Sequence, residues 1–129
     1  MFILDTHVLL WLVSSQTELS EKAKKVIRTN SGSLYVSSIS AFEIAIKHYK
    51  KKLELPLSPD IWFKKAISLH GIDEITINSE ILVHSASLPP IHNDPADRII
   101  ISTAMIHKAK IISKDKIVKK YPDVSVIWS

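Results

Sequence analysis

The short apolar run at the start of the chain constrains the fold most strongly. Phe2, Ile3 and Leu4 are followed at once by Asp5, and apolar residues then recur at helix-compatible spacing through Leu12. A short, unbroken apolar run is typical of a strand covered on both faces, as in a parallel sheet. Asp5 would then lie at the carboxyl end of that strand, which is the edge where open α/β sheets bind their ligands.

The rest of the chain alternates between strand and helix patterns. Apolar and β-branched runs predict four more strands, at residues 34–36, 72–77 (an edge strand), 111–113 and 124–128. Apolar spacing, N-cap residues and the single Gly71 cap predict helices at residues 6–13, 20–29, 39–53, 58–70, 78–86 and 95–108, with a short one ending near 121. This order predicts an α/β fold, one domain over residues 1–129 with a central parallel sheet of about five strands flanked by helices.

Composition narrows the class of protein. A length of 129 residues suits one domain, and the absence of cysteine excludes disulfides, thiolate metal sites and a cysteine nucleophile. Seventeen Lys and Arg against 13 Asp and Glu give a net charge of +4, which favours polyanionic partners, although solvated helix faces explain any single cluster equally well. We find no signal-peptide pattern and no apolar run of about 20 residues, so we expect a cytoplasmic protein without a membrane partner.

Five acidic residues stand at element boundaries or on buried helices: Asp5, Glu43, Asp94, Asp97 and Asp115. Gathered in one place they would repel each other, and a divalent cation would remove that cost. Oxygen-only ligands favour Mg²⁺ or Mn²⁺, and such a centre can activate water for attack on a phosphodiester.

We therefore predict that four of these acids, Asp5, Glu43, Asp97 and Asp115, bind metal and act in catalysis, with Asp94 as a candidate fifth ligand. Thr6 and Ser113 are candidates for orienting a carboxylate or a water molecule. Lys47 and Arg98 are candidate contacts to the substrate.

Each acid also has a purely structural explanation. Asp5 and Asp115 could cap the helices that follow them, and Asp94 before Pro95 is a good helix start. Glu43 could pair with Lys47 four residues later, which is worth only about 0.3–0.5 kcal/mol. A non-catalytic α/β module that binds RNA or protein is therefore the alternative. A phosphatase-like enzyme with an aspartyl nucleophile is disfavoured, because no acid stands two residues after Asp5.

Three ordered segments, residues 1–11 (MFILDTHVLLW), 38–47 (SISAFEIAIK) and 92–104 (HNDPADRIIISTA), resemble a PIN domain. Within that family they are similar to VapC-type toxins of bacterial toxin–antitoxin pairs. The resemblance covers residues 1 to about 128 and maps the family's four acids onto those predicted above, with Asp94 as the extra acid of an Asp-Pro-x-Asp-Arg variant. Where the family often has Thr-x-Asp after its fourth strand, this chain has Ser113-Lys114-Asp115. The hydroxyl is kept, and we expect the less usual lysine at the middle position to affect the bound metal.

The resemblance implies a Mg²⁺- or Mn²⁺-dependent endoribonuclease that acts on tRNA or other structured RNA. It also implies a homodimer that is inhibited by a cognate antitoxin, which docks a peptide segment along a groove near the active site.

Overall fold

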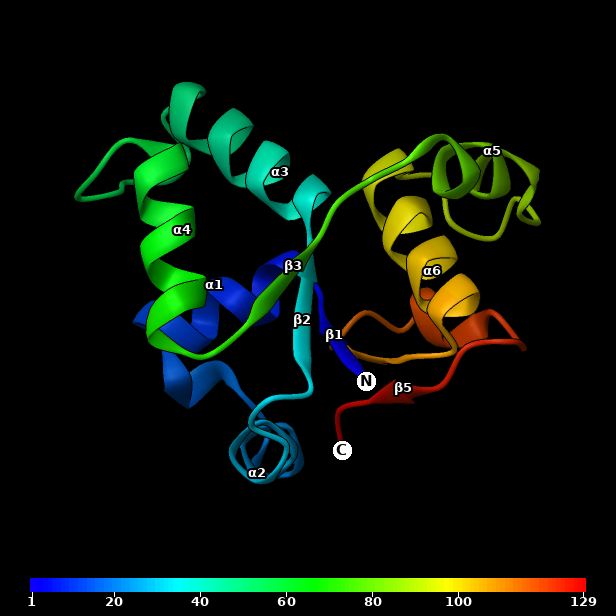
Figure 1. Ribbon diagram of the computed structural model, residues 1–129, viewed down its shortest axis with the longest axis horizontal. Coiled ribbons are helices and arrows are strands. Elements are labelled where there is room, and N and C mark those ends of the chain that lie inside the picture. Colours follow the sequence, from blue (N-terminus) through cyan, green and yellow to red (C-terminus); the bar gives the residue numbers. More distant parts are fainter.

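The apolar runs form one five-stranded parallel sheet in the computed structural model, which describes residues 1–129 (Figure 1). The strands are β1 (Phe2–Leu4), β2 (Leu34–Ser37), β3 (Asp73–Ile75), β4 (Lys110–Ile112) and β5 (Val126–Ile127). Their order in the sheet is β3-β2-β1-β4-β5, so β3 is an edge strand as predicted. The predicted α/β fold with a central parallel sheet is confirmed.

Helices cover both faces of the sheet, as a buried parallel sheet requires. They are α1 (Thr6–Ser14), α2 (Glu21–Thr29), α3 (Ser38–Tyr49), α4 (Pro59–Leu69), α5 (Ser79–Ser87) and α6 (Pro95–His107), with 3₁₀ turns η1 (Gln16–Glu18) and η2 (Val118–Lys120). In Figure 1, α3 and α4 lie on one side of the strands and α5 and α6 on the other. Because successive side chains of a strand alternate, Leu4 packs with α1 and α4 whereas Ile3 packs with α6. No helix, not even α6, has both the length and the apolar character that crossing a bilayer requires.

Two helices differ from their predicted lengths. The helix expected to reach Leu53 ends at Tyr49, because Lys51 adopts the left-handed conformation (φ 59°) and the N–H of Lys52 bonds back to the carbonyl of Lys47 (2.8 Å). Leu53 still packs against the core from the loop that follows, which explains why the apolar spacing continued past the helix end. The short helix expected before Tyr121 is only the 3₁₀ turn η2.

The strand order creates a switch point at the carboxyl edge of the sheet. β1 pairs with β2 on one side and with β4 on the other. The strands that follow β1 in sequence are first added on the β2 side of the sheet and then on the β4 side, so the strand order changes direction at β1. The N–H of Asp5 extends the ladder by donating to the carbonyl of Ile112 (3.1 Å). The residues just after β1 and β4 therefore lie side by side, at the position where such sheets bind ligands.

Candidate metal centre

Three of the predicted carboxylates line one cavity at this edge. Asp5 follows β1, Asp115 lies just beyond β4, and Asp97 is in the first turn of α6. Together with His7, Trp11 and Lys114 they enclose about 320 Å³. The fold thus gathers acids from positions 5, 97 and 115, which are far apart in the sequence.

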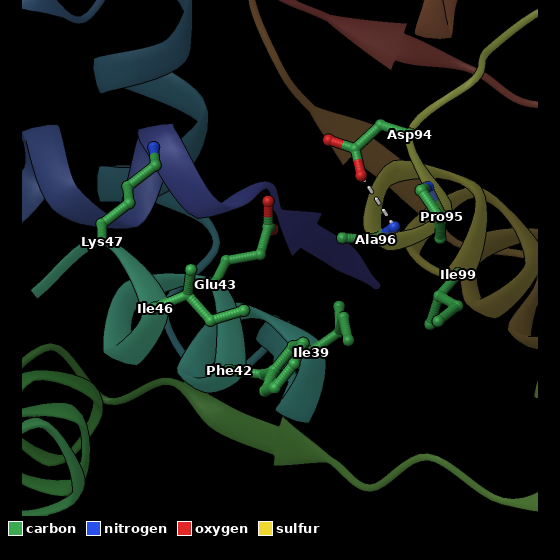
Figure 2. A pocket seen from close by; sticks show the side chains of 9 residues that line it. All are labelled: Ile39, Phe42, Glu43, Ile46, Lys47, Asp94, Pro95, Ala96 and Ile99. Carbon is green, nitrogen blue, oxygen red and sulfur yellow. Dashed lines mark hydrogen bonds between the residues drawn. The ribbon is translucent and has the colours of Figure 1, made fainter. Parts of the chain in front are cut away.

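The other two predicted acids lie on an adjoining groove of about 400 Å³ between α3 and α6. Glu43 comes from α3 and Asp94 from the N-cap of α6, and Figure 2 shows their carboxylates on facing walls of this groove. The negative charges of Glu43 and Asp94 both raise the pKa of Asp97, which links the groove electrostatically to the cavity. All five acids therefore belong to one neighbourhood.

His92 bridges two of the carboxylates. Its Nε2 lies 2.9 Å from Oδ2 of Asp115 and 3.2 Å from Oδ2 of Asp97, and its Nδ1 accepts a hydrogen bond from the N–H of Asp94 (3.1 Å). Because Nδ1 is an acceptor, the neutral ring carries its proton on Nε2 and donates toward the acids. His92, Asp97 and Asp115 offer ligand atoms within 4.8 Å of one another. His92 is not among the predicted site residues, although it stands beside the Asp94–Asp97 segment in the sequence.

Burial makes ionisation of two of the carboxylates costly. Burial raises the pKa of Asp5 to about 6, against the hydrogen bonds from Ser113 and the N–H of Val8, and the charge of Asp115 adds to the rise. Burial also raises the pKa of Asp97 to about 7, with Asp94 and Glu43 contributing through like-charge repulsion.

The pKa values of Glu43 and Asp115 are shifted in opposite directions. Burial raises the pKa of Glu43, although the hydrogen bond from Thr6 opposes the rise. For Asp115, burial favours a higher pKa, but the hydrogen bonds from His92 and from the N–H of Ile117 outweigh it, so its pKa is lowered. A nearby cation would favour the charged form of each carboxylate.

The capping explanation also holds for two of the acids, because Oδ1 of Asp5 accepts from the N–H of Val8 (2.9 Å) and Oδ1 of Asp94 accepts from that of Ala96. It is wrong for Asp115, whose Oδ1 accepts from the N–H of Ile117 in a local turn before η2, and η2 has no side-chain cap. A carboxylate has two oxygens with about four lone-pair sites, so a capping bond leaves the group able to bind a metal ion. These bonds fix the orientation of the carboxylates at the edge of the sheet.

The two predicted hydroxyl residues, Thr6 and Ser113, form hydrogen bonds to the acids. Thr6 Oγ1 donates to Oε1 of Glu43 and also bonds to Ser40 Oγ (2.8 Å). Ser113 Oγ accepts from the N–H of Asp115 (3.0 Å), and its side chain is hydrogen-bonded to Asp5. Thr6 and Ser113 are 3% and 1% exposed, so both hydroxyls are enclosed with the carboxylates that they orient.

The two predicted substrate contacts have other partners. Lys47 forms no ion pair with Glu43; its Nζ donates to Nε2 of His7 (3.0 Å). Both terminal nitrogens of Arg98 donate to backbone carbonyls, those of Ser85, Leu88, Pro89 and His92. These bonds give Arg98 a structural role, tying the loop before α6 to the end of α5, rather than a surface available to a substrate.

The donor set fits a hard divalent cation. It consists of carboxylate oxygens with one imidazole nearby, a combination that suits Mg²⁺ or Mn²⁺ better than softer metals. The raised pKa values of the buried Asp5 and the half-buried Asp97 also favour a cation, because a bound cation would relieve the cost of ionising them.

Comparisons with known proteins identify the family and the fold of this chain. Ribonuclease VapC22 of Mycobacterium tuberculosis (strain ATCC 25618 / H37Rv) is 27% identical over 129 residues, 98% of this chain and 97% of the relative. A toxin–antitoxin complex from Klebsiella pneumoniae contains a chain with a TM-score of 0.68 and 22% identity, and DNA-bound VapBC from Salmonella typhimurium contains one with 0.70 and 14%; each match covers 98% of this chain and 96% of the other. Residues 2–124 match the PIN domain as a family. The match spans nearly the whole sequence and confirms the resemblance drawn from its three segments, so this chain belongs to the PIN domain family.

Proposed function

We propose that this PIN domain is a Mg²⁺- or Mn²⁺-dependent endoribonuclease. The observation that carries the proposal is the gathering of Asp5, Asp97 and Asp115 in one cavity at the switch point of the sheet. The similarity to Ribonuclease VapC22 over 98% of the chain supports the same reaction class.

In this proposal the carboxylates of Asp5, Asp97 and Asp115 hold the metal, and Glu43 and Asp94 complete the site directly or through water. A cation bound there would lower the pKa of a coordinated water molecule and neutralise charge on the phosphodiester. The Thr6 hydroxyl orients the carboxylate of Glu43, and Ser113 hydrogen-bonds to the side chain of Asp5 while its Oγ accepts from the backbone N–H of Asp115.

Basic side chains at the rim attract the RNA backbone. Lys114 lines the cavity, and Lys47 lies on the adjoining groove beside Glu43 (Figure 2). Their positive charge offsets the repulsion between the acids and the phosphates of an approaching strand.

We further propose that the protein is the toxin of a toxin–antitoxin pair, since several of its structural relatives are toxin–antitoxin complexes. The groove between α3 and α6 suits an apolar segment of the antitoxin, because Ile39, Phe42 and Ile46 of α3 face Ile99 of α6 across it. Phe42 is 60% exposed, which leaves a large ring for a partner to cover. A cytoplasmic homodimer that cleaves tRNA or other structured RNA completes the proposal, and light scattering of the purified protein tests the dimer.

The deciding experiment measures RNA cleavage by the purified protein with Mn²⁺, with Mg²⁺ and with EDTA. Wild-type protein should cut only with metal, and Asp97→Asn should lose the activity. Asp123→Asn is the matched control, because it removes the same charge from an exposed turn outside the site. Equal cleavage by wild type and Asp97→Asn, or metal-independent RNA binding without any cleavage, would favour the non-catalytic alternative.

A further inference from the structure

The cavity that holds the carboxylates is also lined by two aromatic rings. They belong to His7 and Trp11, one turn apart on α1, and Lys114 lines the cavity as well. The ring centroids of His7 and Trp11 are 5.7 Å apart with the planes inclined at 38°. The same cavity therefore presents both carboxylates and aromatic rings to a ligand.

Trp11 is held in place by contacts with a second tryptophan and with the hydrophobic core. Its ring centroid lies 5.8 Å from that of Trp128 at the end of the chain, and its side chain packs against the core that contains Leu4 and Val8. Trp11 is only partly buried, so a fixed indole reaches the cavity wall. A ring held in one orientation loses little conformational freedom when another ring stacks on it.

Lys114 lines the same cavity as the indole and the acids. Its Nζ lies 5.9 Å from the centroid of Trp11, a cation–π distance. The ammonium is therefore near enough to the indole to contact a phosphate whose base stacks on the ring. Such a contact would give a function to the lysine at the middle position of Ser113-Lys114-Asp115.

We propose that His7 and Trp11 form a subsite that stacks the nucleobase next to the scissile phosphodiester, while Lys114 contacts the adjoining phosphate. This inference rests on the proposed ribonuclease function and narrows its substrate class. A base can stack on a protein ring only after it leaves its own stack, so the target is an unpaired nucleotide in a loop, bulge or single strand. Stacking is tolerant of sequence, so the subsite selects unpaired structure more than base identity.

Removal of the base from an otherwise identical strand tests the subsite. A short oligoadenylate and an abasic oligomer of the same length and charge are titrated in Mg²⁺ against tryptophan emission. The oligoadenylate should quench emission and bind about 5- to 150-fold more tightly, which is the value of one base–aromatic stack. Equal binding of the two oligomers, or no binding of either, would overturn the subsite whatever the variants do.

Variants assign the effect to the ring. Trp11→Leu keeps an apolar side chain against the core but should abolish the preference for the base-containing strand, so both oligomers bind alike. Trp62→Phe, a change of another tryptophan, buried on α4 outside the cavity, should keep the preference. Lys114→Gln should weaken both oligomers to the same extent, because it removes only a phosphate contact. A preference that survives in Trp11→Leu would place the stacking elsewhere and refute the assignment.

Cleavage of the same oligomers in Mn²⁺ separates this inference from the proposed function. A base preference in binding without any cleavage would keep the subsite and remove the nuclease. Equal cleavage of both strands would keep the nuclease and remove the subsite.

Discussion

Replacing Asp5 by Asn should stabilise the metal-free protein while removing its metal response. The substitution keeps the side-chain oxygen that accepts from the N–H of Val8, so the cap of α1 survives. What it removes is a negative charge on a side chain that is 8% exposed and whose pKa burial raises from 3.8 to about 6. The usual expectation for loss of a buried, hydrogen-bonded carboxylate is destabilisation, so the predicted sign is distinctive.

The magnitude follows from the pKa of Asp5. Ionising Asp5 costs about 3 kcal/mol more in the folded protein than in the unfolded chain, because its pKa is higher by about 2 and each pKa unit corresponds to about 1.36 kcal/mol. Between about pH 4 and pH 6 the folded protein binds more protons than the unfolded chain, so the free energy of unfolding falls as the pH rises through this window. Above pH 6 the loss is constant. Asp5→Asn should therefore gain up to about 3 kcal/mol over wild type at pH 8 in EDTA, and the gain should vanish toward pH 4.

Urea unfolding followed by circular dichroism measures the free energy of unfolding of both proteins in EDTA, at pH 8 and near pH 4. A further measurement at pH 8 replaces EDTA by Mn²⁺. Saturating Mn²⁺ should stabilise the wild type by mass action and leave Asp5→Asn nearly unchanged. Asp123→Asn, which removes an exposed charge, should behave like wild type in every condition. If Asp5→Asn is less stable than wild type at pH 8 in EDTA, the ionised carboxylate stabilises the metal-free fold and the electrostatic reasoning is wrong.

Three further predictions concern the surroundings of the centre. Arg98→Met should cost about 2–4 kcal/mol in urea unfolding, because it deprives several loop carbonyls of a charged donor; an unchanged midpoint would contradict the structural role. His92→Leu should raise the pKa of Asp115, because it removes a hydrogen bond that lowers that pKa; carboxyl-carbon NMR titration measures the shift, and an unchanged pKa would mean that the bond is not formed in solution. Phe42→Glu should weaken antitoxin binding at least tenfold in calorimetry without changing RNA cleavage; undiminished affinity would move the docking site away from the groove.

Many features of the fold, such as helix starts and ends, depend on residues that are close together in the chain, and these features could be predicted from the sequence. The N–H of Ala23 bonds to the Ser20 side chain and the N–H of Ala96 bonds to that of Asp94, as their residue types and spacing predict for helix starts. Gly71 ends α4 with φ +62°, the conformation that favours glycine. Lys51 and Lys108 take the same left-handed conformation without being glycine; the helix end near Lys108 was predicted, whereas the end of α3 before Lys51 was not.

The candidate site was predictable as a list of acids but not as a set of contacts. The sequence alone determined that acids follow buried strands and begin a buried helix, because apolar runs and capping residues act over a few positions. Only the tertiary structure decided that β4 lies beside β1, that His92 bridges Asp97 and Asp115, and that Arg98 is bound by backbone carbonyls. These partners are chosen by the packing of whole helices on the sheet, and no short-range pattern in the chain encodes which distant side chain will lie within hydrogen-bonding distance.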